Sequence, residues 1–292
     1  MQKMDSRRFQ ARKAVQSMSD VSNRNPKTEL GSEQPWFVLS AARHYDLITS
    51  QDPAISHFYS FEADQSQGLT FAIPDGCIDI LFDCSAPQAK VCGTTLAARS
   101  ADLTHQHRYF GIRFAMGVMP DFLQTDIAEL IDKEVNWLEL APNSDSLLAQ
   151  ITEQTDARSQ AKLFEGFING RSHRQTSALT HQAMKLLRET HGNLKINDLE
   201  THTGYSRRTL QRQFAEDLGL SPKTFSRIVL CQNAIHDINR HTDVVLSDLA
   251  FDLGFSDQSH FQREFKKFVN ATPVEYLNKL QGNGYQERIR RV

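Results

Sequence analysis

Two sets of hydrogen-bonding side chains in the C-terminal third of the chain recur at helical spacing. The sets are Arg208, Gln211 and Arg212 and, about 50 residues later, Ser259, Gln262 and Arg263. Each set occupies positions i, i+3 and i+4, which share one face of a helix. Arginine can donate two hydrogen bonds to guanine, and glutamine can pair with adenine. The two faces therefore carry chemistry suited to the major groove of DNA.

Further polar residues flank both sets. Arg207 precedes the first set, while Gln258 and Lys266 flank the second. Long basic side chains at such positions can reach the phosphates beside the contacted bases. We therefore expect the DNA-contacting residues to be Arg207, Arg208, Gln211, Arg212, Gln258, Ser259, Gln262, Arg263 and Lys266.

The second set requires a short helix, a tight turn and a second helix to position it. Apolar residues at i, i+3, i+4 and i+7 from Leu246 to Leu253 predict a helix with one buried face. Gly254 follows, where a left-handed backbone ends a helix at little strain. Ser256 or Asp257 can then cap the next helix. This pattern is typical of a helix-turn-helix unit.

The same pattern occurs earlier in the chain, with Gly204 at the turn and Ser206 as the cap. We place the two units at about 194–217 and 244–268. Between them, Ser221-Pro222 starts a helix of about 18 residues, which spans roughly 27 Å. One turn of DNA is about 34 Å long, so this helix can place both units in successive major grooves. A helical bundle with a polar exterior is the alternative, and two copies with matched caps favour DNA binding.

The two repeated units resemble those of a known family of bacterial regulators. The segment VVLSDLAFDLGFSDQSHFQREFKKFVNATPVEYL (244–277) closely resembles the signature of AraC/XylS bacterial transcription regulators, and 194–225 resembles the first helix-turn-helix of that family. The resemblance implies seven helices over about 178–280, two recognition helices and control of transcription. It also places family base and phosphate contacts on the residues of the two sets and on Gln258.

The chain departs from this family at two places. Glu200 stands where the family usually has a small alanine, which predicts looser packing of the first unit. Leu230 and Asn233 stand in the connecting helix where arginines are frequent, which predicts fewer contacts with the DNA backbone.

The fold class predicted for the whole chain is α+β, with a mostly β N-terminal domain followed by an all-α C-terminal domain. Short aromatic and β-branched runs over 36–118, broken by turns, predict strands, and helical periodicity follows over 120–170. We expect a sensory or dimerisation domain at 35–170, a linker at 171–177 and the DNA-binding domain at 178–281. The ends, 1–34 and 282–292, are predicted to be a disordered arm and a flexible tail.

Part of the N-terminal domain resembles an uncharacterised domain found on some members of the same family. The resemblance rests on IPDGCIDILFD (73–83), Val91-Cys92-Gly93 and GIRFAMGVMPDFL (111–123). It implies no ligand. We interpret Asp75, Asp79 and Asp83 as turn and strand-exterior carboxylates in preference to catalytic groups.

An enzyme fused to DNA-binding units is the alternative function. Cys77, Cys84 and Cys92 lie near His105 and His107, but no CxxC pair occurs, so core packing is favoured over a metal site. His105-Gln106-His107 alone is too sparse for a cupin-like metal site. An alkyl-transfer repair enzyme would need a reactive-cysteine motif and a zinc cysteine set, and neither spacing occurs. We expect no catalytic residue, no metal and no cofactor.

Charge is divided unevenly along the chain. The net charge of −2 comprises +4 from Arg174 onward and −6 before it. A basic C-terminal part suits DNA, while the acidic part suits a domain that does not contact it. The expected partners are double-stranded DNA with an asymmetric operator and RNA polymerase. A small-molecule effector and a second copy of the chain are considered for the N-terminal domain. No signal peptide or membrane segment is predicted, so we expect a cytoplasmic protein.

Overall fold

The computed structural model describes residues 33–64, 70–240 and 244–292, with side-chain surroundings for all of these except 281–283. Most of the predicted disordered arm, 1–34, lies outside the described residues. Its last two residues, Glu33 and Gln34, form hydrogen bonds with other parts of the chain. Gln34 Nε2 donates hydrogen bonds to the carbonyl of Ile73 at 2.7 Å and to Asp75 Oδ2 at 2.8 Å. Glu33 N donates to Gln232 Oε1 at 2.8 Å.

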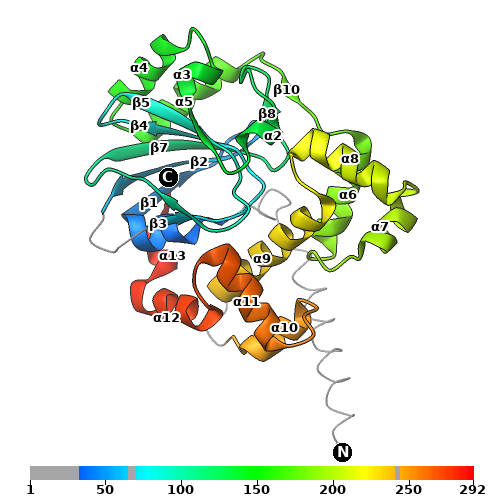
Figure 1. The fold of residues 1–292 in the computed structure, drawn as a ribbon. Coiled ribbons are helices and arrows are strands. Elements are labelled where there is room, and N and C mark those ends of the chain that lie inside the picture. The colour runs from blue at the N-terminus through cyan, green and yellow to red at the C-terminus, as the bar shows by residue number, and fades with distance from the viewer. Residues whose placement is uncertain (1–32, 65–69, 241–243) are drawn as a thin grey trace, which may run out of the picture. The chain divides into compact units, whose positions relative to one another are not determined.

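The chain changes from strands to helices as it proceeds (Figure 1). The first part contains η1 (Phe37–Ala41), β1 (Ala42–Ile48), β2 (Ile55–Ala63), β3 (Thr70–Ala72), β4 (Asp79–Asp83), β5 (Gln88–Cys92), β6 (Arg99–Ala101), β7 (Arg108–Phe114), β8 (Met119–Pro120), α2 (Ile127–Leu130), β9 (Glu134–Asn136), α3 (Trp137–Leu140), α4 (Asp145–Glu153) and α5 (Ala157–Ile168). The second part contains β10 (His173–Arg174), α6 (Ala178–Glu189), α7 (Ile196–Thr203), α8 (Arg207–Leu218), α9 (Pro222–Arg240), α10 (Leu246–Asp252), α11 (Gln258–Val269), α12 (Pro273–Asn283), α13 (Tyr285–Arg288) and β11 (Ile289–Arg291). The predicted α+β class is confirmed.

A seven-stranded sheet in the order β11-β1-β2-β7-β4-β5-β9 organises the N-terminal part. Its pairs are antiparallel except for β11, which runs parallel to β1. Two smaller ladders join β3 to β6 and β8 to β10.

Side chains alternate between the two faces of this sheet, as a strand period of two requires. On one face, Phe58 and Phe110 pack with Trp137 and Phe164, so the helices α3–α5 cover that face. On the other face, tyrosines and phenylalanines join η1 and the C-terminal helices in one continuous core. Gly111 allows this packing, because a Cβ there would lie 2.0 Å from the ring of Tyr59 on the adjacent strand.

The carboxylates of Asp75, Asp79 and Asp83 are buried. Asp75 lies in the loop before β4, but the interpretation of Asp79 and Asp83 as strand-exterior groups was wrong. The three residues are 2%, 8% and 5% exposed. Asp83 pairs with His107 Nδ1 at 2.8 Å. Asp75 and Asp79 share Arg113. Alternation with apolar residues suggested a solvated face, but η1 and the β3–β6 ladder cover this side of the sheet.

The segment 282–292, for which a flexible tail is predicted, contains a short strand. Residues 289–291 form β11 on the edge strand β1, with Tyr45 opposite Ile289. Arg290 Nε and Nη2 bind the two oxygens of Asp46 at 2.6 and 3.0 Å. The tail is ordered because its backbone pairs with an otherwise open sheet edge.

The segment 171–177, predicted as a linker, connects the two parts through ordered contacts. Its strand β10 pairs with β8. Ser177 accepts a hydrogen bond from Thr180 N and donates one to Asp217 Oδ2 at 2.6 Å, so it caps α6 and contacts α8. None of the helices in the described ranges is long and apolar enough to cross a membrane.

Candidate nucleic-acid interface

The first candidate reading surface is presented by α8, the second helix of a tightly connected pair. The helix α7 ends at Gly204, whose φ of 75° is the left-handed conformation that glycine adopts readily. Ser206 then accepts a hydrogen bond from Thr209 N and caps α8 as predicted. Leu210 and Phe214 are fully buried, which fixes the opposite face of α8 toward solvent.

The solvent-facing side of α8 carries the three residues of the first set and the flanking Arg207. All four side chains are exposed: Arg207, Arg208, Gln211 and Arg212. Arg212 Nη1 lies 2.9 Å from Glu216 Oε1 one helical turn later. An exposed pair of this kind contributes little stability, so the guanidinium can exchange Glu216 for a DNA group at small cost.

Glu200 has a role that the sequence did not suggest. Its side chain is half-buried, and Oε1 accepts a hydrogen bond from the backbone N–H of Arg207. The carboxylate therefore satisfies one of the free N–H groups at the start of α8, where negative charge is favourable.

The second candidate surface is presented by α11. Asp257 caps this helix by accepting a hydrogen bond from His260 N at 2.8 Å, and that bond lowers the pKa of the Asp257 carboxyl. Phe261, Phe265 and Phe268 are at most 2% exposed and hold the helix against its neighbours. Of the two caps suggested by the sequence, Ser256 and Asp257, the structure uses Asp257.

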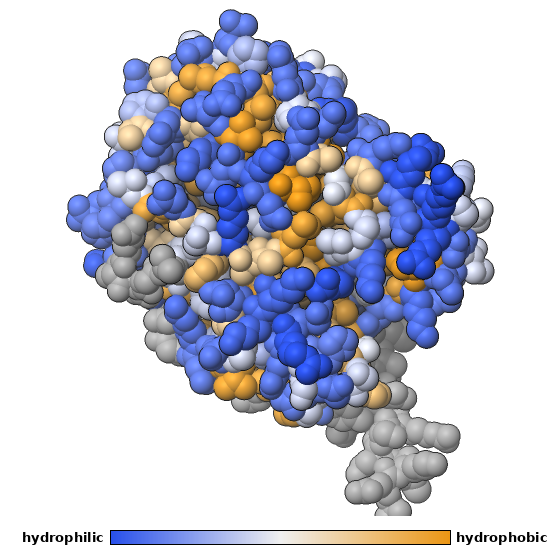
Figure 2. Space-filling model, viewed as in Figure 1, coloured by the Kyte–Doolittle hydropathy of each residue, from blue (hydrophilic) through white to orange (hydrophobic). Residues whose placement is uncertain are grey.

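The residues predicted for the second set lie on the outer side of α11. Gln258, Ser259, Arg263 and Lys266 are exposed, whereas Gln262 is half-buried. Over α8 and α11 the surface is mainly hydrophilic in the view of Figure 2. The structure therefore brings each predicted set onto one accessible helix.

The helix α9 runs without a break between the two pairs and has 19 residues. At 1.5 Å per residue it spans roughly 28 Å, close to the length expected from the sequence. Arg227 on α9 donates from Nε to Glu264 Oε2 on α11 at 2.7 Å, and its guanidinium lies 5.0 Å from the ring centre of Phe268. These contacts orient α11 on α9. Sequence reasoning missed Arg227 and Glu264 because they are far apart in the chain and carry no local pattern.

Asn233, one of the two departures on α9, faces the interior. Its side chain is buried, donates to the carbonyl of Val229 at 2.8 Å and lies 3.2 Å from His191 Nδ1. The side chain at this position packs between helices and is not available to a DNA phosphate.

A helix-turn-helix domain model matches residues 199–279, which include both candidate surfaces. The C-terminal part of the chain therefore carries an AraC-type helix-turn-helix domain, and the resemblance inferred from the sequence is confirmed. Residues 51–136 match a domain of unknown function (DUF6597), which confirms the second resemblance.

Two relatives that match part of the chain are transcriptional regulators of the helix-turn-helix type. An uncharacterized HTH-type transcriptional regulator of Staphylococcus aureus is 34% identical over 86 residues, which are 30% of this chain and 11% of the relative. The HTH-type transcriptional activator RhaS of Escherichia coli O157:H7 is 35% identical over 77 residues, which are 26% of this chain and 27% of RhaS. The matches thus span from about a tenth to about a quarter of these relatives.

Solved structures with similar arrangements are more distant in sequence. Apo ToxT from Vibrio cholerae has 14% identity and a TM-score of 0.44, covering 81% of this chain and 96% of ToxT. A probable AraC family transcriptional regulator from Rhodopseudomonas palustris has 24% identity and a TM-score of 0.32, covering 35% of this chain and 97% of that protein.

Proposed function

We propose that the chain is a sequence-specific transcription regulator that inserts α8 and α11 into successive major grooves of DNA. The observation that carries this proposal is the repeated geometry. Two capped helices expose arginine and glutamine faces, and the single helix α9 joins them. A helix of roughly 28 Å suits the separation of adjacent major-groove segments on one side of the duplex.

Within this proposal the side chains divide into two tasks. Arginine and glutamine near the start of each helix read base edges, and the flanking basic residues hold phosphates. The base-reading group comprises Arg208, Gln211, Arg212, Gln258, Ser259, Gln262 and Arg263. The phosphate-binding group comprises Arg207 and Lys266.

We further propose that the N-terminal domain controls DNA binding, through an effector or a second copy of the chain, and that RNA polymerase is the protein partner. Direct contacts between the N-terminal domain and the C-terminal helices support such control of DNA binding. Trp36 Nε1 donates to the carbonyl of Val269, at the end of α11, at 2.6 Å. Gln232 on α9 donates to the carbonyls of Pro74 at 2.9 Å and Glu33 at 3.3 Å. The N-terminal domain therefore contacts both α11 and the helix that joins the two candidate surfaces.

A binding measurement on Arg263→Ala tests the proposal. The wild-type protein would first select its preferred DNA from a random duplex library, and affinities for that DNA would then be compared. Loss of the Arg263 base contact should weaken binding by about 1–3 kcal/mol and relax the preference at one position.

Lys185→Ala is the matched control, because Lys185 is an exposed basic residue on α6, outside both proposed surfaces. It should change affinity far less than Arg263→Ala. Equal effects of the two variants, or no selected DNA at all, would contradict the proposed function.

A further inference from the structure

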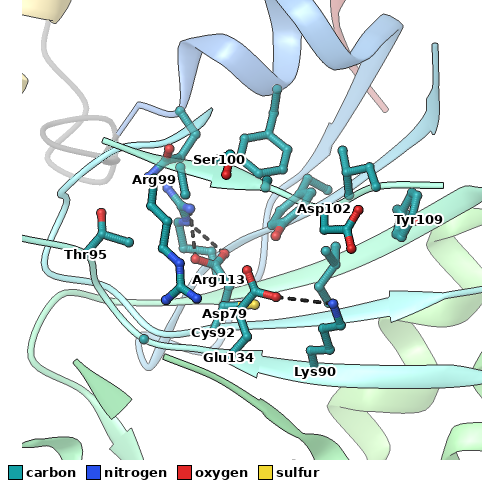
Figure 3. Close-up of a pocket in the computed structure, with 18 of the residues that line it drawn as sticks. Asp79, Lys90, Cys92, Thr95, Arg99, Ser100, Asp102, Tyr109, Arg113 and Glu134 are labelled. Atoms are coloured by element: carbon teal, nitrogen blue, oxygen red, sulfur yellow. Dashed lines mark hydrogen bonds and ion pairs between the residues drawn. The ribbon is translucent and has the colours of Figure 1, made fainter. Parts of the chain in front are cut away.

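A cavity of about 230 Å³ opens on the aromatic face of the sheet, between η1 and the β3–β6 ladder (Figure 3). Tyr45, Tyr59 and Tyr109 provide aromatic walls, and Phe37 of η1 contributes a further ring. A water needs only about 10–15 Å³ of such space. The cavity is therefore large enough for a small organic molecule.

The inner wall of the cavity carries two buried carboxylates that share one guanidinium. Arg113 stands directly opposite Asp79 in the β4–β7 ladder and donates to it from Nε at 3.0 Å and from Nη2 at 2.8 Å. Arg113 Nη1 also lies 2.9 Å from Asp75 Oδ2. One guanidinium thus serves two carboxylates, and all three side chains are at most 12% exposed.

The burial of this triad leaves Asp79 incompletely stabilised. Desolvation raises the pKa of its carboxyl, in spite of the opposing attraction of Arg113. Three further cations line the cavity: Lys90, which is paired with Glu134 at 3.2 Å, Arg99, which donates to the carbonyl of Asp132, and Lys133. A positive group that entered the cavity beside Asp79 would favour the ionised form of this carboxyl.

Thr95 provides a second and independent observation. It lines the cavity and is 6% exposed, and within the described part of the chain its hydroxyl has no hydrogen-bond partner. A buried polar group without a partner destabilises the folded protein. A ligand with a polar atom near Thr95 would remove that penalty.

We propose that this cavity binds a small organic cation, an amine or a guanidine, with its positive group beside Asp79 and a polar atom at Thr95. The tyrosine rings add to the recognition, because cations are attracted to aromatic faces. Gln34 joins the site to the rest of the molecule, since it binds Asp75 and lies two residues before Trp36, which donates to the carbonyl of Val269 on α11. The regulatory consequence of this binding rests on the proposed function, whereas the binding itself does not.

Calorimetry on the full-length protein tests the charge requirement. The probes are phenethylamine, agmatine and cadaverine, each compared with a neutral analogue in which every amine and guanidine is replaced by a hydroxyl. At least one cation should bind, and its neutral analogue should bind at least tenfold more weakly. Absence of binding by all three cations, or equal binding of the neutral analogues, would overturn the proposal.

A pair of variants locates the site. Thr95→Val should weaken binding of the cation several-fold while leaving the melting temperature unchanged or raised, because the hydroxyl it removes lacks a partner. Ser40→Ala is the matched control: Ser40 also has a buried hydroxyl without a partner among the described residues, but it does not line the cavity. Identical cation affinities for the two variants would exclude this site.

Separate measurements test cation binding in the cavity and the proposed function, so that either hypothesis can fail without the other. Selection of DNA by the wild-type protein tests the helices α8 and α11 without any cation. Cation binding by calorimetry tests the cavity without any DNA. Asp79→Asn adds a third comparison, since a folded variant should lose the preference for the cation over its neutral analogue.

Discussion

At the scale of single residues, Glu200 shows how one side chain can stabilise the start of a proposed recognition helix. Its carboxylate accepts the hydrogen bond of Arg207 N, while Ser206 accepts that of Thr209 N. Two free N–H groups at the start of α8 are thus satisfied by different side chains. The same carboxylate adds a negative charge near the N-terminus of the helix, where the helix dipole favours it.

Glu200→Ala should therefore lower the free energy of unfolding by about 0.5–2 kcal/mol, as expected for the loss of a helix cap. Glu200→Gln keeps an acceptor oxygen and should lose less than half as much. Urea denaturation of the full-length variants measures both effects. If the Glu200→Ala variant were as stable as the wild-type protein, the hydrogen bond from Arg207 N would contribute nothing to stability. The role of Glu200 as a cap of α8 would then be rejected.

Some contacts of single residues could not be predicted from the sequence. Glu200 was expected to loosen packing, because a sequence does not reveal that the carboxylate can turn toward the next helix. The burial of Asp75 and Asp79 was missed for a related reason. Their common partner, Arg113, is more than thirty residues away, and only the β4–β7 register places it opposite Asp79.

At the scale of elements, the boundaries of the C-terminal helices follow local signals. Thr272 and Glu275 form a reciprocal capping box at the start of α12. Ser206 and Asp257 act similarly for α8 and α11. Such caps can be predicted because each involves residues within three positions of one another.

The cap of α11 gives a prediction for pH dependence. The pKa of Asp257 is lowered by hydrogen bonds from His260 N and from the hydroxyl of Ser256. Its ionised form therefore stabilises the fold fully above the unfolded pKa of about 3.9, and that contribution is lost as the pH falls through the lower folded value.

Asp257→Asn keeps an acceptor but cannot ionise. The stability difference between wild type and Asp257→Asn should be largest near neutral pH and should shrink below about pH 4. Urea denaturation across this range provides the measurement. A difference that stays constant with pH would show that the charge of Asp257 has no part in capping α11.

The strand β11 could not be predicted from local signals. Its residues, Ile289-Arg290-Arg291, form a short polar segment, and their partner β1 lies at the opposite end of the described sequence. Arg288 also donates to the carbonyls of Val38, Leu39 and Ala42, each at 3.3 Å. Pairing over such a separation depends on the tertiary fold, which delivers the tail to an open edge.

Removal of residues 289–292 should therefore expose the edge of β1. Amide hydrogen exchange at Leu47 should become at least tenfold faster, because the backbone of this residue faces β11 and its carbonyl accepts a hydrogen bond from Val292 N at 3.1 Å. Arg290→Ala is the control, since it removes only a half-exposed ion pair to Asp46 and should alter exchange little. Unchanged exchange in the truncated protein would mean that β11 is not paired in solution.

At the scale of the whole molecule, the two proposed reading surfaces share a scaffold but differ in chemistry. The α8 surface presents three arginines and one glutamine, whereas the α11 surface presents two glutamines, one serine, one arginine and one lysine. A single chain carries both surfaces, and α9 fixes their order. One chain should therefore read two different half-sites in a defined direction.

DNA selected by the wild-type protein should accordingly be asymmetric, with two half-sites about one helical turn apart. Inverting one half-site should reduce affinity at least tenfold, which corresponds to about 1.4 kcal/mol. Arg212→Ala should relax the preference only in one half-site and Arg263→Ala only in the other, because each residue belongs to a different helix. A palindromic selected sequence bound by two chains, with both variants affecting the same positions, would show that the two surfaces do not act together in one chain.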